Sequence, residues 1–175
     1  RLDKGLDSKG CVVTANNDLV EISKYIELNK TPIVIVQDLV FLQDKTWQAN
    51  RDALSETVTK WLEAWRAKNI EQYMSFYHPE LFKDAKGNWK TYRAYKQAVF
   101  SNPGTPKIDL TNISILQFKN YAVVNFKQSY QSSTIIDSGK KTLYLMQDEK
   151  YQWKIVTENW TKAVLEGQHD KFAFV

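Results

Sequence analysis

One residue in the chain could act as a covalent nucleophile: Cys11, in the segment Ser-Lys-Gly-Cys-Val of residues 8–12. A cysteine attacks as its thiolate, and a nearby cation or a helix N-terminus favours that form by lowering the pKa of the thiol. Lys9 is adjacent in the sequence, and Gly10 permits the tight backbone path that presents a side chain at a loop tip. The alternative is an incidental or buried cysteine, because one cysteine beside a glycine is a weak signal.

General acid–base chemistry has a second candidate in His78, with Glu80 or Asp84 near it in the sequence. The alternative is that His78, which precedes a proline at a helix end, is a surface or capping residue. The other histidine, His169, lies in a polar tail and is interpreted as solvated. The acidic residues Asp137, Asp148, Glu149 and Glu158 are scattered over turns and strands without metal-ligand spacing, so neither a metal nor a cofactor is predicted.

Aromatic side chains form the third set of candidates, because Phe, Trp and Tyr make up 13% of the residues. Those that could line a pocket are Trp65, Tyr73, Phe82, Trp89, Tyr95, Phe126, Trp153 and Trp160. Aromatic faces suit sugar rings. Core packing is the alternative for each of them, because one aromatic side chain buries about 150–250 Å².

The elements that position Cys11 are predicted to be a loop, a helix and a strand. Residues 16–18, Asn-Asn-Asp, offer N-cap side chains, and Leu19, Ile22 and Ile26 follow at helical spacing. A proline at position 32 ends the helix. The β-branched residues 33–36 predict a strand buried on both faces, but residues 1–50 contain no neighbouring strand, which suggests the edge of a larger sheet.

The rest of the chain predicts three helices followed by at least four antiparallel strands. Apolar residues at helical spacing predict helices over 54–65, over 70–77 and from Thr91 to about residue 100, and Thr91 is predicted to cap the third of them. Alternating residues predict two hairpins, 110–118 with 121–130 and 142–147 with 151–157. Helices followed by strands imply an α+β fold with the helices on one face of the sheet.

Composition excludes several other classes of protein. With 175 residues, 24 Lys and Arg, and 20 Asp and Glu, the net charge is +4, which is too mild to indicate a nucleic-acid partner. No run reaches the ~18 apolar residues of a membrane span. A single cysteine excludes an internal disulfide and a cysteine-rich zinc site.

Residues 5–37 resemble the end of the YkuD-type L,D-transpeptidase catalytic domain, which carries a Ser-His-Gly-Cys pattern followed by an amphipathic helix and a Thr-Pro strand. The resemblance implies that Cys11 attacks a peptide carbonyl in the peptidoglycan stem, forming an acyl-enzyme that an amine or water releases. It makes Ser8 and Gly10 the other catalytic-site residues, and backbone N–H groups such as that of Gly10 would help to form the oxyanion site.

Three departures from that family bear on activity. Lys9 stands where the family usually has histidine, and Val13 stands where it often has arginine, which puts recognition of a substrate carboxylate in question. The general-base histidine of the family lies upstream of the cysteine, whereas the histidines here lie downstream. A Cys/His mechanism needs the base within ~3 Å of the sulfur. The isolated chain is therefore expected to be inactive.

Residues 50–162 resemble a nuclear transport factor 2-like (SnoaL-like) domain. The resemblance rests on Trp61 and Trp65, the helix end at 76–79, Trp89 and the closing hairpin with Trp160. It implies a cone-shaped, curved antiparallel sheet packed with three N-terminal helices. The predicted organisation is a loop-helix-strand remnant of a YkuD-type catalytic domain at 1–45, the cone domain at 46–165 and a tail at 166–175.

This order of domains resembles that of the cell-shape L,D-carboxypeptidases of helical bacteria. It implies a fragment of a periplasmic peptidoglycan L,D-transpeptidase or L,D-carboxypeptidase whose signal peptide precedes Arg1. The cone would bind a peptidoglycan stem peptide or glycan, or mediate a homodimer. The alternative is a free-standing SnoaL-like small-molecule binding protein or enzyme that uses the aromatic pocket, with residues 1–45 as an extension.

Overall fold

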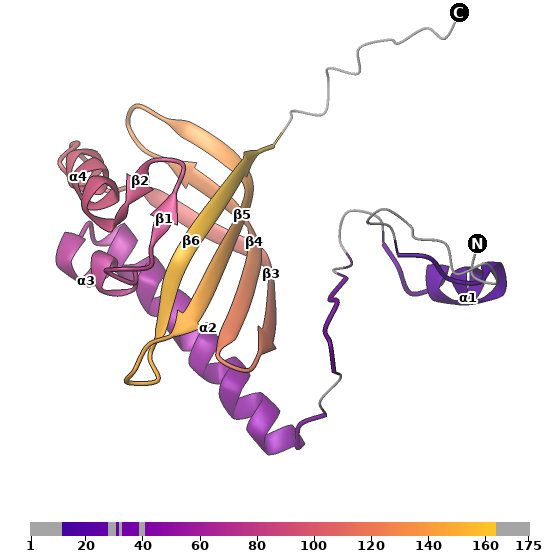
Figure 1. Ribbon diagram of the computed structural model, residues 1–175. Helices are drawn as coiled ribbons and strands as arrows, with labels where there is room; N and C mark the ends of the chain where they lie inside the picture. Colours follow the sequence, from indigo (N-terminus) through magenta and orange to yellow (C-terminus); the bar gives the residue numbers. More distant parts are fainter. Residues whose placement is uncertain (1–11, 28–30, 32, 39–40, 164–175) are drawn as a thin grey trace, which may run out of the picture. The chain divides into compact units, whose positions relative to one another are not determined.

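The computed structural model describes residues 12–27, 31, 33–38 and 41–163, and the chain divides into two compact units, Arg1–Phe41 and Leu42–Val175 (Figure 1). The predicted catalytic residues Ser8, Gly10 and Cys11 lie outside the described residues. His169 and the predicted tail at 166–175 lie outside them as well.

The first unit contains one described helix, α1 (Asn16–Ser23). Its N-cap position is Ala15 and no side chain caps it, so the predicted capping by residues 16–18 is wrong: these residues lie inside the first turn. The predicted strand over 33–36 is also wrong, since these residues form no strand and Ile35 is 79% exposed. The physical reason is that a strand needs a neighbour for its backbone hydrogen bonds, and none of the described residues pairs with this segment.

The second unit begins with the long helix α2 (Asp44–Arg66), which confirms the helix predicted over 54–65. Its buried stripe consists of Leu54, Val58, Trp61, Ala64 and Trp65. These positions recur at intervals of three or four residues, so they share one face of the helix. That face supplies Trp61 and Trp65 to the interior of the domain.

Two shorter helices and a small hairpin follow: α3 (Ile70–Ser75), β1 (Lys83–Asp84), β2 (Gly87–Asn88) and α4 (Trp89–Phe100). The side chain of Asn88 caps α4 by accepting hydrogen bonds from the backbone N–H groups of Lys90 and Thr91. The prediction that Thr91 caps this helix is therefore wrong. Asn88 precedes the first helical residue, and that is the position from which a short polar side chain reaches the free N–H groups.

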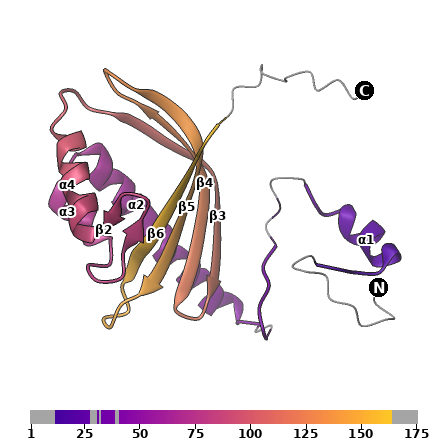
Figure 2. The same cartoon turned by 45° about the horizontal axis from the view of Figure 1, so that its top comes forward.

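The four long strands β3 (Lys107–Phe118), β4 (Tyr121–Gln131), β5 (Ile136–Gln147) and β6 (Trp153–Lys162) form one antiparallel sheet in the order β3-β4-β5-β6. Both predicted hairpins are confirmed. The sheet is curved, and α2, α3 and α4 cover one of its faces (Figures 1 and 2). The predicted α+β class, with helices on one face of an antiparallel sheet, is confirmed.

Strand β6 carries an extra residue relative to β5. Tyr144 pairs with Thr157 and Leu145 pairs with Ile155, so Val156 is the bulged residue. A bulge reverses the alternation of side chains beyond it. Trp153 and Ile155 therefore face the core before the bulge, and Glu158 faces it afterwards.

The hydrophobic core lies between the helices and the sheet and is dominated by aromatic rings. Trp61, Tyr73 and Tyr92 are fully buried, and Tyr77 and Phe82 are each 1% exposed. None of the described helices is long and apolar enough to span a membrane.

Candidate functional site

Three charged residues lie within this aromatic core: Lys96 on α4, Lys141 on β5 and Glu158 on β6. We call them the buried charged cluster. Lys96 is 6% exposed, and the side chains of Lys141 and Glu158 are 5% and 8% exposed. The Lys141 Nζ donates to Glu158 Oε1 at 2.8 Å. Charged groups are almost never this deeply buried unless they are paired, and this cluster holds two cations and one anion.

Tyrosine hydroxyls complete the surroundings of the Glu158 carboxylate. The Tyr92 hydroxyl donates to Oε1 at 2.9 Å, and the Tyr77 hydroxyl lies 3.0 Å from Oε2. The Tyr77 hydroxyl also accepts from Trp61 Nε1 at 3.0 Å and lies 2.7 Å from that of Tyr73. Burial, together with the nearby Glu158 charge, raises the pKa of all three tyrosines well above 10.0, so they remain protonated donors.

The ammonium group of Lys96 lies over aromatic rings. Its Nζ is 4.5 Å from the ring centroid of Trp65 and 5.2 Å from that of Tyr73. The rings of Tyr92 and Tyr95 are 5.4 Å and 5.9 Å away. A cation over such rings is attracted to their negative faces, which compensates part of the free energy lost by removing it from water.

The surroundings of the cluster lower the pKa values of both Lys96 and Glu158, for different reasons. Burial and the nearby Lys141 charge lower the pKa of Lys96 to about 7, against the attraction of Glu158. For Glu158, burial raises the pKa, but the charges of Lys141 and Lys96 and its hydrogen bonds outweigh burial and lower it to about 2. Glu158 is therefore an anion at neutral pH, whereas Lys96 is near its midpoint.

Each member of the cluster is placed by the periodicity of its own element. Lys96 lies between Tyr92 and Phe100 on the buried face of α4, at intervals of four residues. Lys141 continues the inward alternation of Leu143 and Leu145 on β5. These two spacings are visible in the sequence, and they are the signal from which a buried lysine could have been found. Glu158 depends on the bulge, which the sequence does not show.

Two polar atoms beside the cluster are buried without a hydrogen-bond partner among the described residues: Trp65 Nε1 and Gln128 Oε1. Trp65 stacks on Tyr130, and Trp61 contacts Phe126. Gln128 lies between these two β4 residues on the same inward face. The site therefore has an unused donor, an unused acceptor and, in Lys96, a lysine that no carboxylate pairs with among the described residues. A carboxylate beside Lys96 would balance its charge.

The aromatic residues predicted to line a pocket occupy three kinds of position. Trp65 and Tyr73 surround the buried charged cluster, and Tyr95, 43% exposed, lies at its border. Phe82, Phe126 and Trp153 are buried in the hydrophobic core, and Trp160 is 37% exposed near the end of β6. Trp89 lines a separate surface hollow together with His78.

The residues of the predicted acid–base group around His78 take part in turn hydrogen bonds. The backbone N–H groups of Glu80 and Leu81 donate to His78 Nδ1, and the N–H of Lys86 donates to Asp84 Oδ1. Within the described part of the chain, no group of His, Cys, Asp and Glu residues could hold a metal ion.

Comparison with known proteins places the second unit in a family. Residues 53–159 match the family described as the Cds6 C-terminal NTF2-like domain. No curated protein sequence matches the chain.

Solved structures resemble a larger part of the chain. Bd1075 from Bdellovibrio bacteriovorus is 30% identical with a TM-score of 0.78, over 90% of this chain and 56% of that protein. The helical cell shape determining protein Pgp2 from Campylobacter jejuni is 23% identical with a TM-score of 0.70, over 89% of this chain and 57% of Pgp2. This chain therefore spans a little over half the length of these two proteins.

An NTF2-like protein of unknown function from Pseudomonas putida is 15% identical with a TM-score of 0.60, over 69% of this chain and 92% of that protein. It shares the fold of the second unit. The family match covers more than half of the sequence, and that match establishes the relationship. The chain belongs to the Cds6 C-terminal NTF2-like domain family.

Proposed function

We propose that the NTF2-like domain binds the stem peptide of peptidoglycan in the buried charged cluster. The observation that carries the proposal is the unbalanced charge of Lys96, Lys141 and Glu158. Two lysines and one glutamate leave Lys96 without a carboxylate partner of its own among the described residues, and a ligand carboxylate would supply one and favour the charged form of Lys96. Stem peptides carry carboxylates and a free amine, so they offer the charges that such a site recognises.

The similarity to Bd1075 and Pgp2 supports a cell-wall context for this ligand. It extends over 89–90% of the chain, whereas the second unit, residues 42–175, is about three quarters of it. The similarity therefore includes part of the first unit. We infer a role in determining cell shape, the function that the name of Pgp2 gives for that protein.

The proposal extends to the whole protein of which this chain would form part. That protein would be a periplasmic L,D-transpeptidase or L,D-carboxypeptidase with Cys11 as the nucleophile. Binding of a stem peptide by the NTF2-like domain would hold the enzyme on its polymeric substrate. The occupied domain would then raise the local concentration of cleavable stems, as linked binding sites do.

The proposal is tested by titrating the full chain with a purified stem tetrapeptide, using calorimetry or amide chemical shifts. We expect saturable binding, and we expect the Lys96→Met variant to bind at least about tenfold more weakly, since a charge-assisted contact contributes about 1.5–3 kcal/mol. This variant leaves the Lys141–Glu158 pair intact, so it is suited to a binding test.

Lys90→Met, at an exposed position of the same helix, is the matched control. It should bind like the original protein. Absence of binding, or equal affinity of the Lys96→Met variant, would contradict the proposal.

A further inference from the structure

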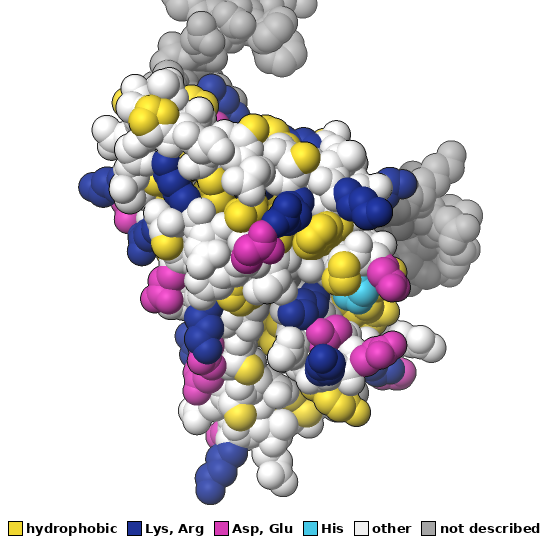
Figure 3. Space-filling model, turned by 90° about the vertical axis from the view of Figure 1, so that its left-hand side faces the viewer, with side chains coloured by type: hydrophobic (Ala, Val, Ile, Leu, Met, Phe, Trp, Pro, Cys, Tyr) yellow, Lys and Arg dark blue, Asp and Glu magenta, His cyan; other side chains and the backbone are white. Residues whose placement is uncertain are grey.

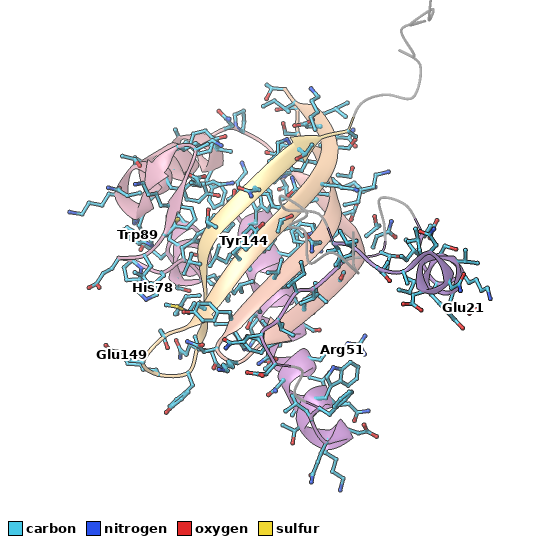
Figure 4. All side chains as sticks on the ribbon, turned by 45° about the vertical axis from the view of Figure 1, so that its right-hand side comes forward. Glu21, Arg51, His78, Trp89, Tyr144 and Glu149 are labelled. Atoms are coloured by element: carbon cyan, nitrogen blue, oxygen red, sulfur yellow. The ribbon has the colours of Figure 1, made fainter. Side chains whose placement is uncertain are left out.

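A surface hollow of about 530 Å³ lies outside the buried charged cluster. It is formed by the end of α3, the first residue of α4 and the turn between β5 and β6. Its polar and aromatic lining includes His78, Trp89, Asp148, Glu149, Gln152 and Lys154. Figure 4 shows the labelled His78, Trp89 and Glu149 on the same side of the domain, and Figure 3 shows a histidine among hydrophobic and charged side chains on this face. Nothing in the function proposed above uses this hollow.

The imidazole of His78 is held in one orientation and one tautomer. Its Nδ1 accepts from the backbone N–H groups of Glu80 and Leu81 at 3.3 Å and 3.2 Å. The backbone N–H of His78 donates to the Ile155 carbonyl at 2.9 Å. Because an accepting Nδ1 carries no proton, the ring proton is on Nε2. His78 thus presents a fixed N–H donor at the hollow.

The charges that line the hollow nearly cancel, and some of them maintain its shape. Asp148 Oδ1 accepts from the N–H groups of Lys150 and Gln152 at 2.9 Å each, which holds the β5–β6 turn. Lys154 Nζ donates to the Ser75 carbonyl at 2.8 Å, which ties β6 to the end of α3. With three carboxylates and two lysines in the lining, the hollow has no excess of positive charge with which to attract a phosphate or another anion.

Trp89 supplies an apolar surface among these polar groups. It is partly buried against the core and also lines the hollow. An indole ring surrounded by carboxylate, amide and imidazole groups is suited to a neutral ligand that has one apolar face and hydroxyl groups around its edge. A pyranose ring has both properties.

We propose that this hollow is a second binding site, which takes a ring of a neutral amino-sugar glycan. The sugar ring packs against Trp89, and His78 Nε2 donates to one of its oxygens. The choice of an amino-sugar glycan rests on the proposed peptidoglycan function, because glycan and stem peptide are linked in that polymer. Tyr77 lines the hollow and its hydroxyl contacts Glu158, so one residue belongs to the surroundings of both sites.

The test titrates the full chain with a β-1,4-linked tetramer of N-acetylglucosamine, a glycan that carries neither peptide nor carboxylate. We expect binding that shifts the amide resonances of residues around His78 and Trp89. His78→Asn keeps a side-chain acceptor for the turn but removes the Nε2 donor, so we expect about tenfold weaker binding. Trp89→Phe should weaken binding to a similar extent.

Trp47→Phe, at a tryptophan 51% exposed on α2, is the matched control and should leave the affinity unchanged. Absence of glycan binding, or unchanged affinity in both the His78 and Trp89 variants, overturns the second site. Loss of glycan binding in Lys96→Met also overturns it, because the glycan would then occupy the buried charged cluster. Failure of stem-peptide binding with intact glycan binding would refute only the proposed function, and the converse would refute only the second site.

Discussion

At the scale of single residues, Lys96 is the least expected feature of the domain. Its side chain is 6% exposed, and its ammonium group lies among four aromatic rings rather than in water. Burying a charge costs free energy that cation–π contacts offset only in part. The lowered pKa of Lys96 expresses that cost. The charged form of Lys96 therefore reduces the stability of the domain.

This cost predicts the pH dependence of stability. The pKa of Lys96 is about 7 in the folded protein, below the 10.5 of an unperturbed lysine, so between these values the unfolded chain binds more protons. Lys96 therefore makes the free energy of unfolding increase as pH rises from about 7 to 10.5, and this increase is absent below pH 7. Lys96→Met should remove the increase and raise stability at pH 6 by a few kcal/mol, since one pKa unit is about 1.4 kcal/mol.

Urea unfolding at pH 6, 8 and 9.5 measures this effect, with Lys90→Met as the exposed control. If the free energy of unfolding had the same pH dependence in Lys96→Met and in the original protein, the lowered pKa of Lys96 would be refuted.

If Lys96→Met is more stable, as expected, its binding defect cannot result from loss of folding. The variant therefore separates ligand recognition from stability.

At the scale of elements, the sheet decides which side chains reach the cluster. The β5 alternation turns Lys141 inward, and the bulge at Val156 turns Glu158 inward. Close pairing of β5 and β6 keeps Lys141 Nζ and Glu158 Oε1 2.8 Å apart. Gly139, which pairs with Lys162, lies on the same inward row of β5 as Lys141.

Gly139 is required by the close approach of the two strands. A methyl group at this position would collide with the Thr161 carbonyl and with the Trp160 ring, and a backbone carbonyl cannot move aside without disturbing the ladder. Gly139→Ala should therefore lower the free energy of unfolding by about 1–3 kcal/mol, the usual range for overpacking. Chemical denaturation measures the change. Ser138→Ala, on the neighbouring residue, is the control, and equal stability of the two variants would contradict the explanation.

At the scale of the whole chain, two compact units are present and only the second has a described hydrophobic core. Among the described residues, the buried hydrophobic side chains all lie between Leu54 and Ile155. The family match, residues 53–159, covers the same part of the chain. The second unit therefore has the composition of an independently stable domain.

Deletion of residues 1–41 should leave the second unit folded, with a Tm within about 2 °C of the full chain, because the core residues are all retained. Thermal unfolding followed by circular dichroism measures this. A Tm lowered by substantially more would show that the first unit contributes to the stability of the second. Binding of the stem peptide and of the glycan should also survive the deletion, because both proposed sites lie in the second unit.

The helices and strands of the second unit could be predicted from local patterns. The stripe from Leu54 to Trp65 and the alternation of β4 bury one face each, so their periodicity is present in the sequence. The strand predicted at 33–36 failed because β-branched residues favour an extended backbone but do not provide a pairing partner. The N-cap at Asn88 was missed because Thr91, three residues later, is also a preferred capping residue type.

Local sequence patterns are enough to predict the fold class of the second unit, the order of its elements and the aromatic character of its core. The meeting of Lys96, Lys141 and Glu158 depends on the three-dimensional packing, because these residues come from a helix and two strands. The pairing register also turns Glu158 inward, because one bulged residue reverses the alternation on which a sequence-based prediction depends. Local periodicity determines which face of an element is buried, whereas pairing register and packing determine which buried side chains touch.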